Sequence, residues 1–485
     1  MQRFLLIFIS FILYFCSFPP LKIYPLAFIS LVPLFMATRD LTKNRTFLIA
    51  ILFFYVFWIY HTGWILNMEV DPSSKPWLVA GLLILPLYLS FFNALPFLTL
   101  KNQSRFILFP AVWTILEYLR GITYLGFPWV TIAYSQLENR YFRMLNAVGG
   151  IYFTGFLILL CNLLFFEFWE TSKKKFLASF VLLLIVSHIS GAWLYHRDES
   201  NSGNLKVLIF QPNILPREED YSEWLETSRS YDKLISEVDD TFDLVILPES
   251  GLPGYFRYSK KSQTIINSLS AKTKAPVLLG SSDVDLNGKR KVYNTAFLVY
   301  GDSIISQYNK VHLVPFGEWL PYENKIEILR HIDFGQGDFS PGDSTVLLKV
   351  GNIPFGTLIC FESIFPYITR DYSKKGAGFL VNITSDGWYG KSLGPKEHFE
   401  LLRFRAIESD KYIARSAKTG ISAIIDPKGR VMTSIGLFEW GYIADTIGIR
   451  YSETLYTKFG DFIIIISIIV VISVFIVSKR RKRRG

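Results

Sequence analysis

The strongest pattern in the sequence is a series of long apolar stretches separated by short polar segments. About 20 consecutive apolar residues cross the hydrocarbon core of a bilayer as a helix, because a helix satisfies its own backbone hydrogen bonds in lipid. Eight stretches approach this length: Phe4–Ser17, Leu21–Met36, Phe47–Leu66, Trp77–Leu100, Phe106–Leu119, Ala147–Trp169, Phe176–Tyr195 and Phe462–Val477. The pattern predicts seven transmembrane helices within residues 1–197 and an eighth at 459–478.

Basic residues concentrate in the segments that connect these stretches on one side of the membrane. Examples are Arg3, Lys173–Lys175 and the basic tail at 479–485. Because short cytoplasmic loops retain positive charge, both termini and this tail are predicted to be cytoplasmic, with residues 198–458 outside the cytoplasm. The net charge of +10 at pH 7 therefore reflects membrane topology. Charge beside membrane helices attracts anionic lipid headgroups, so we expect no nucleic-acid partner.

Residues 198–458 form a polar region that is long enough for one domain with its own core. Short β-rich runs recur in it, namely Leu205–Phe210, Leu244–Leu247, Val277–Gly280, Thr295–Tyr300, Thr345–Val350, Thr357–Cys360 and Phe379–Asn382. Helical periodicity separates several of these runs, at Tyr221–Asp239, Ser262–Lys272 and His398–Ser409. The alternation predicts an α/β fold with buried sheets.

Cys360 is the only cysteine in this region, so no disulfide can form within it. A free thiol in an oxidising compartment is either buried filler or chemically useful. The segment Gly356–Ser363 has the pattern of a strand that ends in a sharp turn into a helix. Such a turn can mount an exposed nucleophile, so its position favours a catalytic thiol.

A thiol nucleophile also needs a base and a stabilising cation. Glu249 follows a buried strand through Pro248, and desolvation there would raise the pKa of Glu249 and make it a competent base. Lys310 lies among apolar residues, where a cation could stabilise an oxyanion. Each residue also has a structural interpretation: a helix cap for Glu249, a surface charge for Lys310, and ion-pair partners for Glu318 and Glu362.

These residues carry a family resemblance. The segments Pro248–Ser250, Lys310 with Pro315–Glu318, and Cys360–Glu362 resemble the Glu-Lys-Cys signature of the nitrilase superfamily. The whole chain resembles the apolipoprotein N-acyltransferase family, also through the segments Glu117–Arg120, Gly126–Trp129 and Asn382–Gly390 with His398. The resemblance implies a multi-pass α-helical membrane domain plus an extracytoplasmic α/β nitrilase-like αββα sandwich domain, located in the cytoplasmic (inner) membrane of a bacterium.

The resemblance also implies a mechanism. Glu249 takes the proton of Cys360, whose thiolate attacks the sn-1 ester of a phospholipid such as phosphatidylethanolamine, while Lys310 stabilises the oxyanion. The α-amine of a diacylglyceryl-cysteine apolipoprotein then attacks the thioester, which makes a ping-pong cycle. Glu318 and Glu362 are expected to hold Lys310 and shape the site. No cofactor is expected, and the scattered histidines suggest no metal site.

Three aromatic residues are predicted to contact substrate: Trp129, Phe361 and Trp388. For the two tryptophans, a place in an interfacial aromatic belt or in the core is an equally good interpretation. Phe361 departs from the Tyr that is common after the family's cysteine, so a hydroxyl role does not carry over to this position.

Two alternative functions are also consistent with the sequence, and only the first of them uses the same three residues. One is a membrane-tethered amidase or nitrile hydrolase, in which water is the second nucleophile. The other is a transporter or scaffold whose outer domain is an inactive enzyme fold. Against a transporter, the apolar stretches lack buried charges apart from Glu117 and Arg120.

Overall fold

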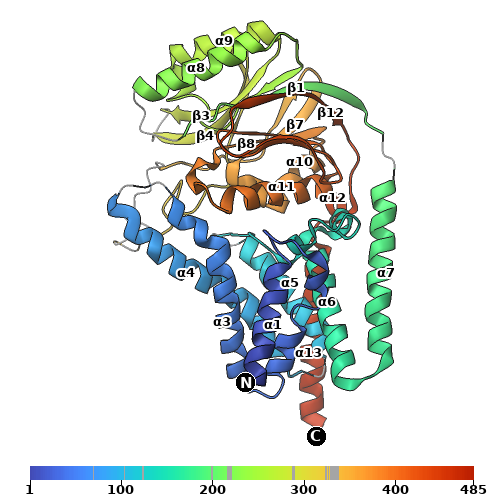
Figure 1. Cartoon of the computed structure of the whole chain (residues 1–485). Coiled ribbons are helices and arrows are strands. Elements are labelled where there is room, and N and C mark those ends of the chain that lie inside the picture. The colour runs from blue at the N-terminus through green and yellow to red at the C-terminus, as the bar shows by residue number, and fades with distance from the viewer. Residues whose placement is uncertain are drawn as a thin grey trace. The chain divides into compact units, whose positions relative to one another are not determined.

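The computed structural model describes the chain except residues 69, 71, 103, 123–124, 198–199, 216–220, 287–289, 323–324, 326, 328–337 and 485. The chain divides into two compact units, each considered by itself (Figure 1). Unit 1 comprises Met1–Leu66, Val79–Asp198 and Lys458–Gly485, and unit 2 comprises Asn67–Leu78 and Glu199–Thr457.

Unit 1 is helical. Its helices are α1 (Gln2–Cys16), α2 (Val32–Thr38), α3 (Lys43–Thr62), most of α4 (Lys75–Ala94), α5 (Arg105–Ile122), α6 (Asn146–Thr171), α7 (Lys174–His196) and α13 (Phe462–Arg484). The predicted helix Leu21–Met36 is instead a 3₁₀ turn, Tyr24–Phe28, followed by α2. Pro25 and Pro33 explain this division, because proline lacks the N–H that a continuous helix needs in its interior.

Five helical segments among the described residues are long and apolar enough to cross a membrane. They are Lys43–Asn67, Pro72–Thr99, Phe142–Thr171, Lys174–His196 and Phe462–Arg480. The apolar segments Gln2–Cys16 and Tyr24–Thr38 are shorter. The eight crossings expected from the sequence therefore stay a prediction.

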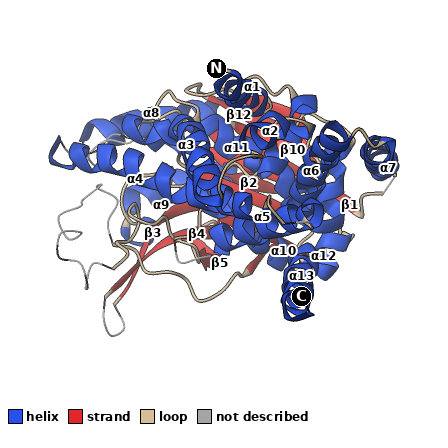
Figure 2. Cartoon of the chain, turned by 90° about the horizontal axis from the view of Figure 1, so that it is seen from below, coloured by secondary structure: helices blue, strands red, loops and turns tan. Residues whose placement is uncertain are grey.

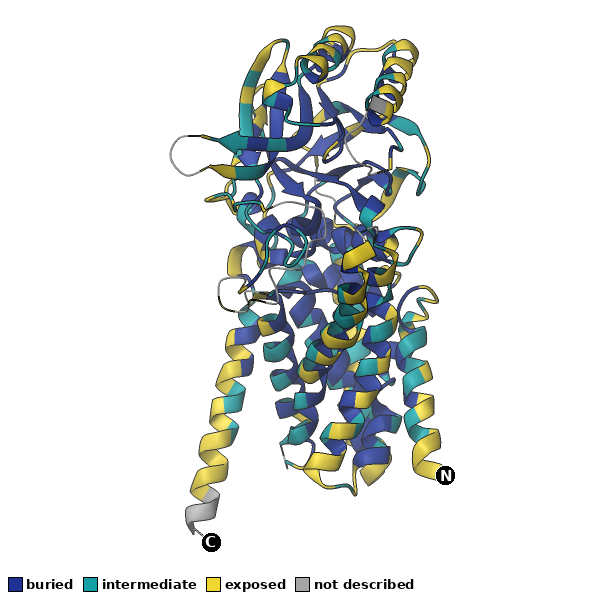
Figure 3. Ribbon diagram, turned by 90° about the vertical axis from the view of Figure 1, so that its left-hand side faces the viewer, coloured by how far each residue is buried: buried dark blue, intermediate teal, exposed yellow. Residues whose placement is uncertain are grey.

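Two of these helices expose apolar side chains along most of their length, as Figure 3 shows for α13, which leads to the C-terminus. On α13, Phe475 is 67% exposed, and on α7, Ile189 is 65% exposed. Contiguous apolar surface of this kind is rare on soluble proteins, whereas lipid covers it without cost. The surface of unit 1 is thus that of a membrane domain.

Unit 2 contains two six-stranded sheets. The first has the order β12-β1-β2-β3-β4-β5 and the second β11-β10-β9-β8-β7-β6. The strands are β1 (Gly203–Gln211), β2 (Leu244–Ile246), β3 (Val277–Asp285), β4 (Lys291–Tyr300), β5 (Ser303–Asn309), β6 (Leu347–Val350), β7 (Ile353–Ile359), β8 (Phe379–Thr384), β9 (Ile413–Ala417), β10 (Ser422–Ile425), β11 (Val431–Ile435) and β12 (Gly441–Ile449). The central strands of each sheet run parallel, β1 to β3 and β7 to β9.

Helices cover the outer faces of both sheets, and the sheets pack against each other through β1, β9 and β10 and through β4 and β7. On the first sheet, α8 (Tyr221–Glu237) and α9 (Lys260–Thr273) share a core with the strands. On the second, α10 (Pro366–Lys374) packs against β7 and α11 (Gly394–Ser409) packs against α10. Figure 1 shows these strands between α8 and α9 on one side and α10 and α11 on the other, and Figure 2 distinguishes helices from strands by colour. The predicted αββα sandwich is confirmed.

The ends of several strands supply the residues of interest. Cys360 follows β7 directly, Lys310 follows β5, Ser385 follows β8, and Glu249 lies three residues after β2. Every residue of β2 and β8 is buried, as expected for parallel strands that are covered on both faces. The C-terminal ends of the parallel strands β2, β7 and β8, and that of β5, which pairs antiparallel with β4, therefore bring these polar groups to one place.

Candidate active site

The nucleophile candidate lies on a constrained turn. Cys360 is the first residue of a short 3₁₀ helix, η9 (Cys360–Ile364), and its φ is +50°. Left-handed backbone is disfavoured for a residue with a Cβ and persists only where the surroundings enforce it. The predicted sharp turn after the strand is confirmed, and we call the segment Ile359–Ser363 the nucleophile elbow.

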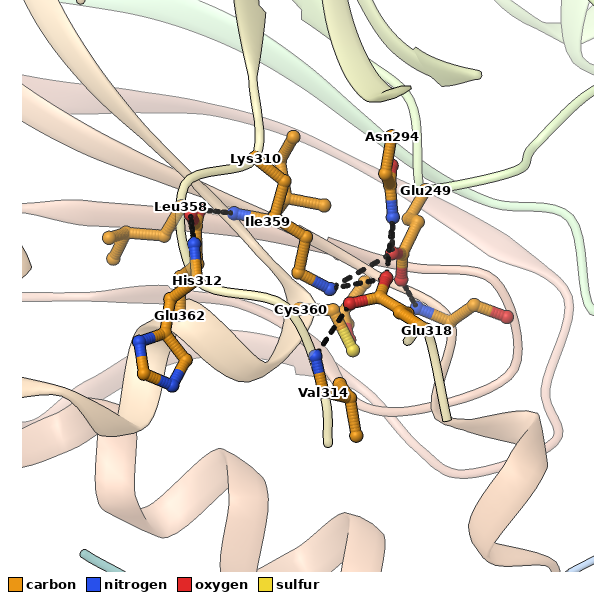
Figure 4. A network of polar contacts seen from close by, with 12 residues as sticks. Glu249, Asn294, Lys310, His312, Val314, Glu318, Leu358, Ile359, Cys360 and Glu362 are labelled. Atoms are coloured by element: carbon orange, nitrogen blue, oxygen red, sulfur yellow. Dashed lines mark hydrogen bonds and ion pairs between the residues drawn. The ribbon is translucent and has the colours of Figure 1, made fainter. Parts of the chain in front are cut away.

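Glu249 and Lys310 lie together beside this elbow (Figure 4). The Nζ atom of Lys310 is 3.9 Å from Oε1 of Glu249. Both side chains are buried, Lys310 at 1% exposure and Glu249 at 6%. Asn294 donates to Glu249 Oε1 at 2.7 Å, and the backbone N–H of Ser385 donates to Oε2 at 2.9 Å. Both oxygens of the candidate base are therefore held in place.

Glu318 holds the ammonium group of Lys310. Lys310 Nζ donates to Glu318 Oε1 at 2.7 Å, and the backbone N–H of Val314 donates to Oε2 at 2.8 Å. Asn294 also donates to Glu318 Oε1 at 3.0 Å, so that one amide bridges the two carboxylates. Glu318 thus holds Lys310 as expected from the sequence, and its supporting role in catalysis stays a prediction.

Glu362 has a different geometry from the one expected. In the described part of the chain, no hydrogen bond or ion pair joins it to Lys310. Its Oε1 accepts from Tyr308 Oη at 2.7 Å and from the backbone N–H of Val311 at 2.8 Å. Its Oε2 accepts from the backbone N–H of Ile359 at 2.8 Å. Glu362 thus joins the segment after Lys310 to the nucleophile elbow through the backbone.

The charges have a clear physical pattern. Burial raises the pKa of the Cys360 thiol, the negative charge of Glu249 raises it further, and Lys310 lowers it. Burial also raises the pKa of Glu249, against the effect of Lys310. Burial alone would lower the pKa of Lys310, but Glu318 and Glu249 raise it above its ordinary value. Burial therefore favours the neutral thiol, the carboxylates keep Lys310 charged, and the raised pKa of Glu249 makes it a stronger base than an exposed carboxylate.

The three predicted substrate-contacting residues lie in different places. Phe361 is buried in η9, with its ring 5.3 Å from that of Phe365 between centroids. Trp388 lies in η10 (Asp386–Tyr389), the short helix after β8. Trp129 belongs to unit 1, where it is buried and stacks on Phe127. Their contact with substrate stays a prediction.

Sequence reasoning missed two of the groups that contact Glu249, which are Asn294 and the backbone of Ser385. An asparagine in the middle of an apolar strand is the signal that could have revealed Asn294, because a buried amide needs polar partners. A backbone N–H leaves no such signal. Among the described residues, no cluster of three or more histidine, cysteine, aspartate or glutamate side chains could hold a metal ion.

The fold and this site define the class of protein, a carbon-nitrogen hydrolase domain. The family model described as Carbon-nitrogen hydrolase matches residues 207–453, and the one described as Apolipoprotein N-acyltransferase N-terminal domain matches residues 10–164. The chain belongs to the apolipoprotein N-acyltransferase family, which makes it a membrane protein and an acyltransferase. The family resemblance and the enzyme class expected from the sequence are confirmed.

The relatives match over nearly their full length. An apolipoprotein N-acyltransferase of Geobacter metallireducens is 32% identical over 467 residues, which cover 92% of this chain and 89% of the relative. One of Rickettsia prowazekii is 30% identical, with coverage of 89% and 90%. Among solved structures, Saccharomyces cerevisiae Nit3, a member of branch 10 of the nitrilase superfamily, is 20% identical with a TM-score of 0.40, covering 54% of this chain and 95% of its own.

Proposed function

We propose that this enzyme moves an acyl chain from a phospholipid, with phosphatidylethanolamine as the donor, to the N-terminal α-amine of a diacylglyceryl-cysteine apolipoprotein. The transfer passes through a thioester on Cys360. The observation that supports this most is the placement of Glu249 and Lys310, a buried base and a buried cation 3.9 Å apart, beside the nucleophile elbow. The acceptor follows from the name that the relatives carry.

In the first half-reaction Glu249 takes the thiol proton, and the thiolate attacks the carbonyl carbon of the sn-1 ester. The new S–C bond places negative charge on the carbonyl oxygen, which Lys310 stabilises. The intermediate collapses by breaking the bond to the glycerol oxygen, which takes the proton from Glu249. The products are a thioester on Cys360 and a lysophospholipid.

In the second half-reaction the neutral α-amine of the apolipoprotein attacks the thioester carbonyl carbon. Glu249 takes a proton from the attacking nitrogen, the C–S bond breaks, and the proton returns to the sulfur of Cys360. An amide forms and the enzyme is restored, which completes a ping-pong cycle. Glu318 supports both steps because it fixes the position of the Lys310 ammonium.

The proposed location is the inner membrane of a bacterium. Both termini lie in the cytoplasm, eight helices cross the membrane, and residues 198–458 face the periplasm. The basic segments named above support this orientation, since positive charge is retained on the cytoplasmic side.

The proposal is tested by the intact mass of the purified protein after incubation with phosphatidylethanolamine alone. We expect a gain of one acyl chain that hydroxylamine removes, in the wild type and in Cys161→Ala but not in Cys360→Ala. Cys161 is a matched control because it is also a free, buried cysteine. Release of fatty acid without an adduct would favour a hydrolase, and an adduct retained in Cys360→Ala would overturn the mechanism.

Variants of the base and the cation test their roles in the same assay. Glu249→Gln removes the proton acceptor and Lys310→Met removes the oxyanion partner, while both keep the side-chain volume nearly constant. We expect each to slow thioester formation by about 10²- to 10⁴-fold. The measurement is the single-turnover rate of adduct formation, and a variant with the wild-type rate would remove that residue from the mechanism.

A further inference from the structure

A second buried polar network lies behind the nucleophile elbow, apart from Glu249, Lys310 and their partners. His398, on α11, places its Nε2 atom 2.8 Å from Oγ of Ser363 and 3.2 Å from the carbonyl oxygen of Cys360. Its Nδ1 atom lies 2.9 Å from Oδ1 of Asp386. The imidazole therefore contacts the elbow with one nitrogen and a carboxylate with the other.

Asp386 is itself fixed by two other residues. Arg415, on β9, donates to Asp386 Oδ2 at 2.6 Å, and the hydroxyl of Thr384 donates to Oδ1 at 2.9 Å. His398, Asp386 and Arg415 are at most 1% exposed. A buried carboxylate with this many partners cannot move without losing hydrogen bonds, so it is a firm anchor for the histidine.

The same short segment also contacts the base. The backbone N–H of Ser385, the residue before Asp386, donates to Glu249 Oε2 at 2.9 Å. Residues 384–386 thus reach the carboxylate of Glu249 on one side and, through His398, the hydroxyl of Ser363 in the nucleophile elbow on the other. A single strand end links the positions of base and nucleophile.

We propose that His398, anchored by Asp386, is a positioning residue that fixes the nucleophile elbow and thereby the placement of the Cys360 thiol relative to Glu249. The inference rests on the proposed function, in which these two groups exchange a proton. The left-handed backbone of Cys360 needs such a restraint, because a residue with a Cβ leaves this conformation readily unless neighbours hold it.

The protonation states agree with this role. Burial lowers the pKa of His398, while the charge of Asp386 opposes the shift and that of Arg415 adds to it. Burial alone would raise the pKa of Asp386, but Arg415 and His398 bring it well below its ordinary value. A neutral ring that donates from Nδ1 to ionised Asp386 leaves Nε2 to accept the hydroxyl proton of Ser363. His398 then restrains the elbow through Ser363.

The test compares two variants of His398. His398→Phe removes the hydrogen bonds to Ser363 and Asp386, whereas His398→Gln keeps a polar side chain that can bond to Ser363. We expect kcat for acyl-adduct formation from phosphatidylethanolamine to fall at least tenfold in His398→Phe, with KM unchanged. A displacement of the Cys360 thiol by a fraction of an ångström is enough to slow its reaction by this factor. The glutamine variant should recover most of this loss.

Glu408→Gln is the matched control. Glu408 lies on the same helix, is equally buried, and pairs with Arg405, which donates to the carbonyl of Ile364 just after the elbow. We expect this variant to lower the melting temperature but to leave kcat per folded molecule near the wild-type value. A kcat loss in Glu408→Gln equal to that of His398→Phe would mean a structural role alone and would overturn the proposal.

Two further measurements keep the inference testable if His398→Phe folds poorly or if no lipid adduct forms. Gly420→Ala displaces Asp386 without changing His398, because the added Cβ would lie only 2.3 Å from Asp386 Oδ2. The rate at which iodoacetamide alkylates Cys360, measured as a function of pH, reports the ionisation of the thiol and of its base without any lipid. An absent adduct in the wild type contradicts the proposed function, whereas an alkylation profile of Gly420→Ala identical to that of the wild type contradicts the positioning role.

Discussion

The thiol of Cys360 is buried, and burial by itself makes a thiol a poor nucleophile, because it raises the pKa. One neighbour offsets this effect, and a second supplies a base. Lys310 lowers the pKa of the thiol through its positive charge, and Glu249 is ready to accept the proton because its own pKa is raised by burial. At the scale of single residues, the proposed mechanism therefore depends on a proton transfer between two buried groups beside a fixed cation.

Asn294 gives a prediction for pH dependence. Its amide donates to the carboxylate of Glu249, a bond that favours the ionised form and lowers the pKa of Glu249. Removing it in Asn294→Ala raises that pKa, so Glu249 is ionised only at higher pH. The acidic limb of the rate of adduct formation should therefore move to higher pH.

The measurement is the single-turnover rate between pH 4 and 9. Asn213→Ala serves as the control, because Asn213 donates to the carbonyl of Phe438 instead of to Glu249. An acidic limb that stays in place in Asn294→Ala, or that moves equally in Asn213→Ala, would contradict the assignment of Glu249 as the base.

At the scale of elements, close packing between neighbouring strands sets the position of the base. A Cβ at Gly280, on β3, would lie 2.7 Å from Cα of Glu249 and 3.0 Å from the Ile383 side chain on β8. Only a glycine lets β3 pass so near the segment after β2. The two sheets meet at this point, so the packing that builds the core also places the carboxylate of Glu249, the proposed base.

Gly280→Ala should therefore affect both stability and catalysis. We expect a loss of about 1–3 kcal/mol in the free energy of unfolding, as for other overpacked cores, together with slower adduct formation. Gly441→Ala is the control on β12 of the same sheet, where the nearest atom to the added Cβ is 3.5 Å away. Thermal unfolding and the single-turnover rate measure the two effects. Wild-type stability and rate in Gly280→Ala would contradict the prediction, because they would show that Glu249 and Ile383 move aside for the added Cβ at no cost.

At the scale of the whole molecule, the chain combines a helical unit whose surface suits lipid with a sandwich that suits water. The proposed topology places the sandwich domain outside the cytoplasm and the basic segments of the helical unit on the cytoplasmic side. In a variant without its native cysteines, Lys260→Cys on α9 should react with an impermeant maleimide in intact spheroplasts. Lys175→Cys, in a basic segment at the start of α7, should react only after permeabilisation.

Both positions are exposed in the structure, so accessibility within the protein does not limit labelling. The reverse pattern, with Lys175→Cys labelled first, would place the catalytic domain in the cytoplasm. Equal labelling of both positions in intact spheroplasts would mean that the membrane was not intact, which a cytoplasmic marker enzyme released into the medium reveals independently.

The sequence predicted much of the fold because local patterns encode local structure. The runs that became β1 to β4 and β6 to β8 were identified, and so were α8, α9 and the end of α11, from their periodicity. The strands β5 and β9 to β12 were missed. For β11 and β12 the reason is physical: they are partly exposed and carry polar residues, so they lack a continuous apolar run.

By itself the sequence determined the membrane class and the α/β domain and, through the motifs of a family, it identified Glu249, Lys310 and Cys360 as the candidate catalytic residues. These depend on composition, periodicity and short segments, which neighbouring residues carry. Only the tertiary structure decided how Asn294, Ser385 and His398 meet this group, and that Glu362 binds backbone instead of Lys310. Such contacts join segments far apart in the chain, and their geometry follows from the packing of two whole sheets, which no local pattern records.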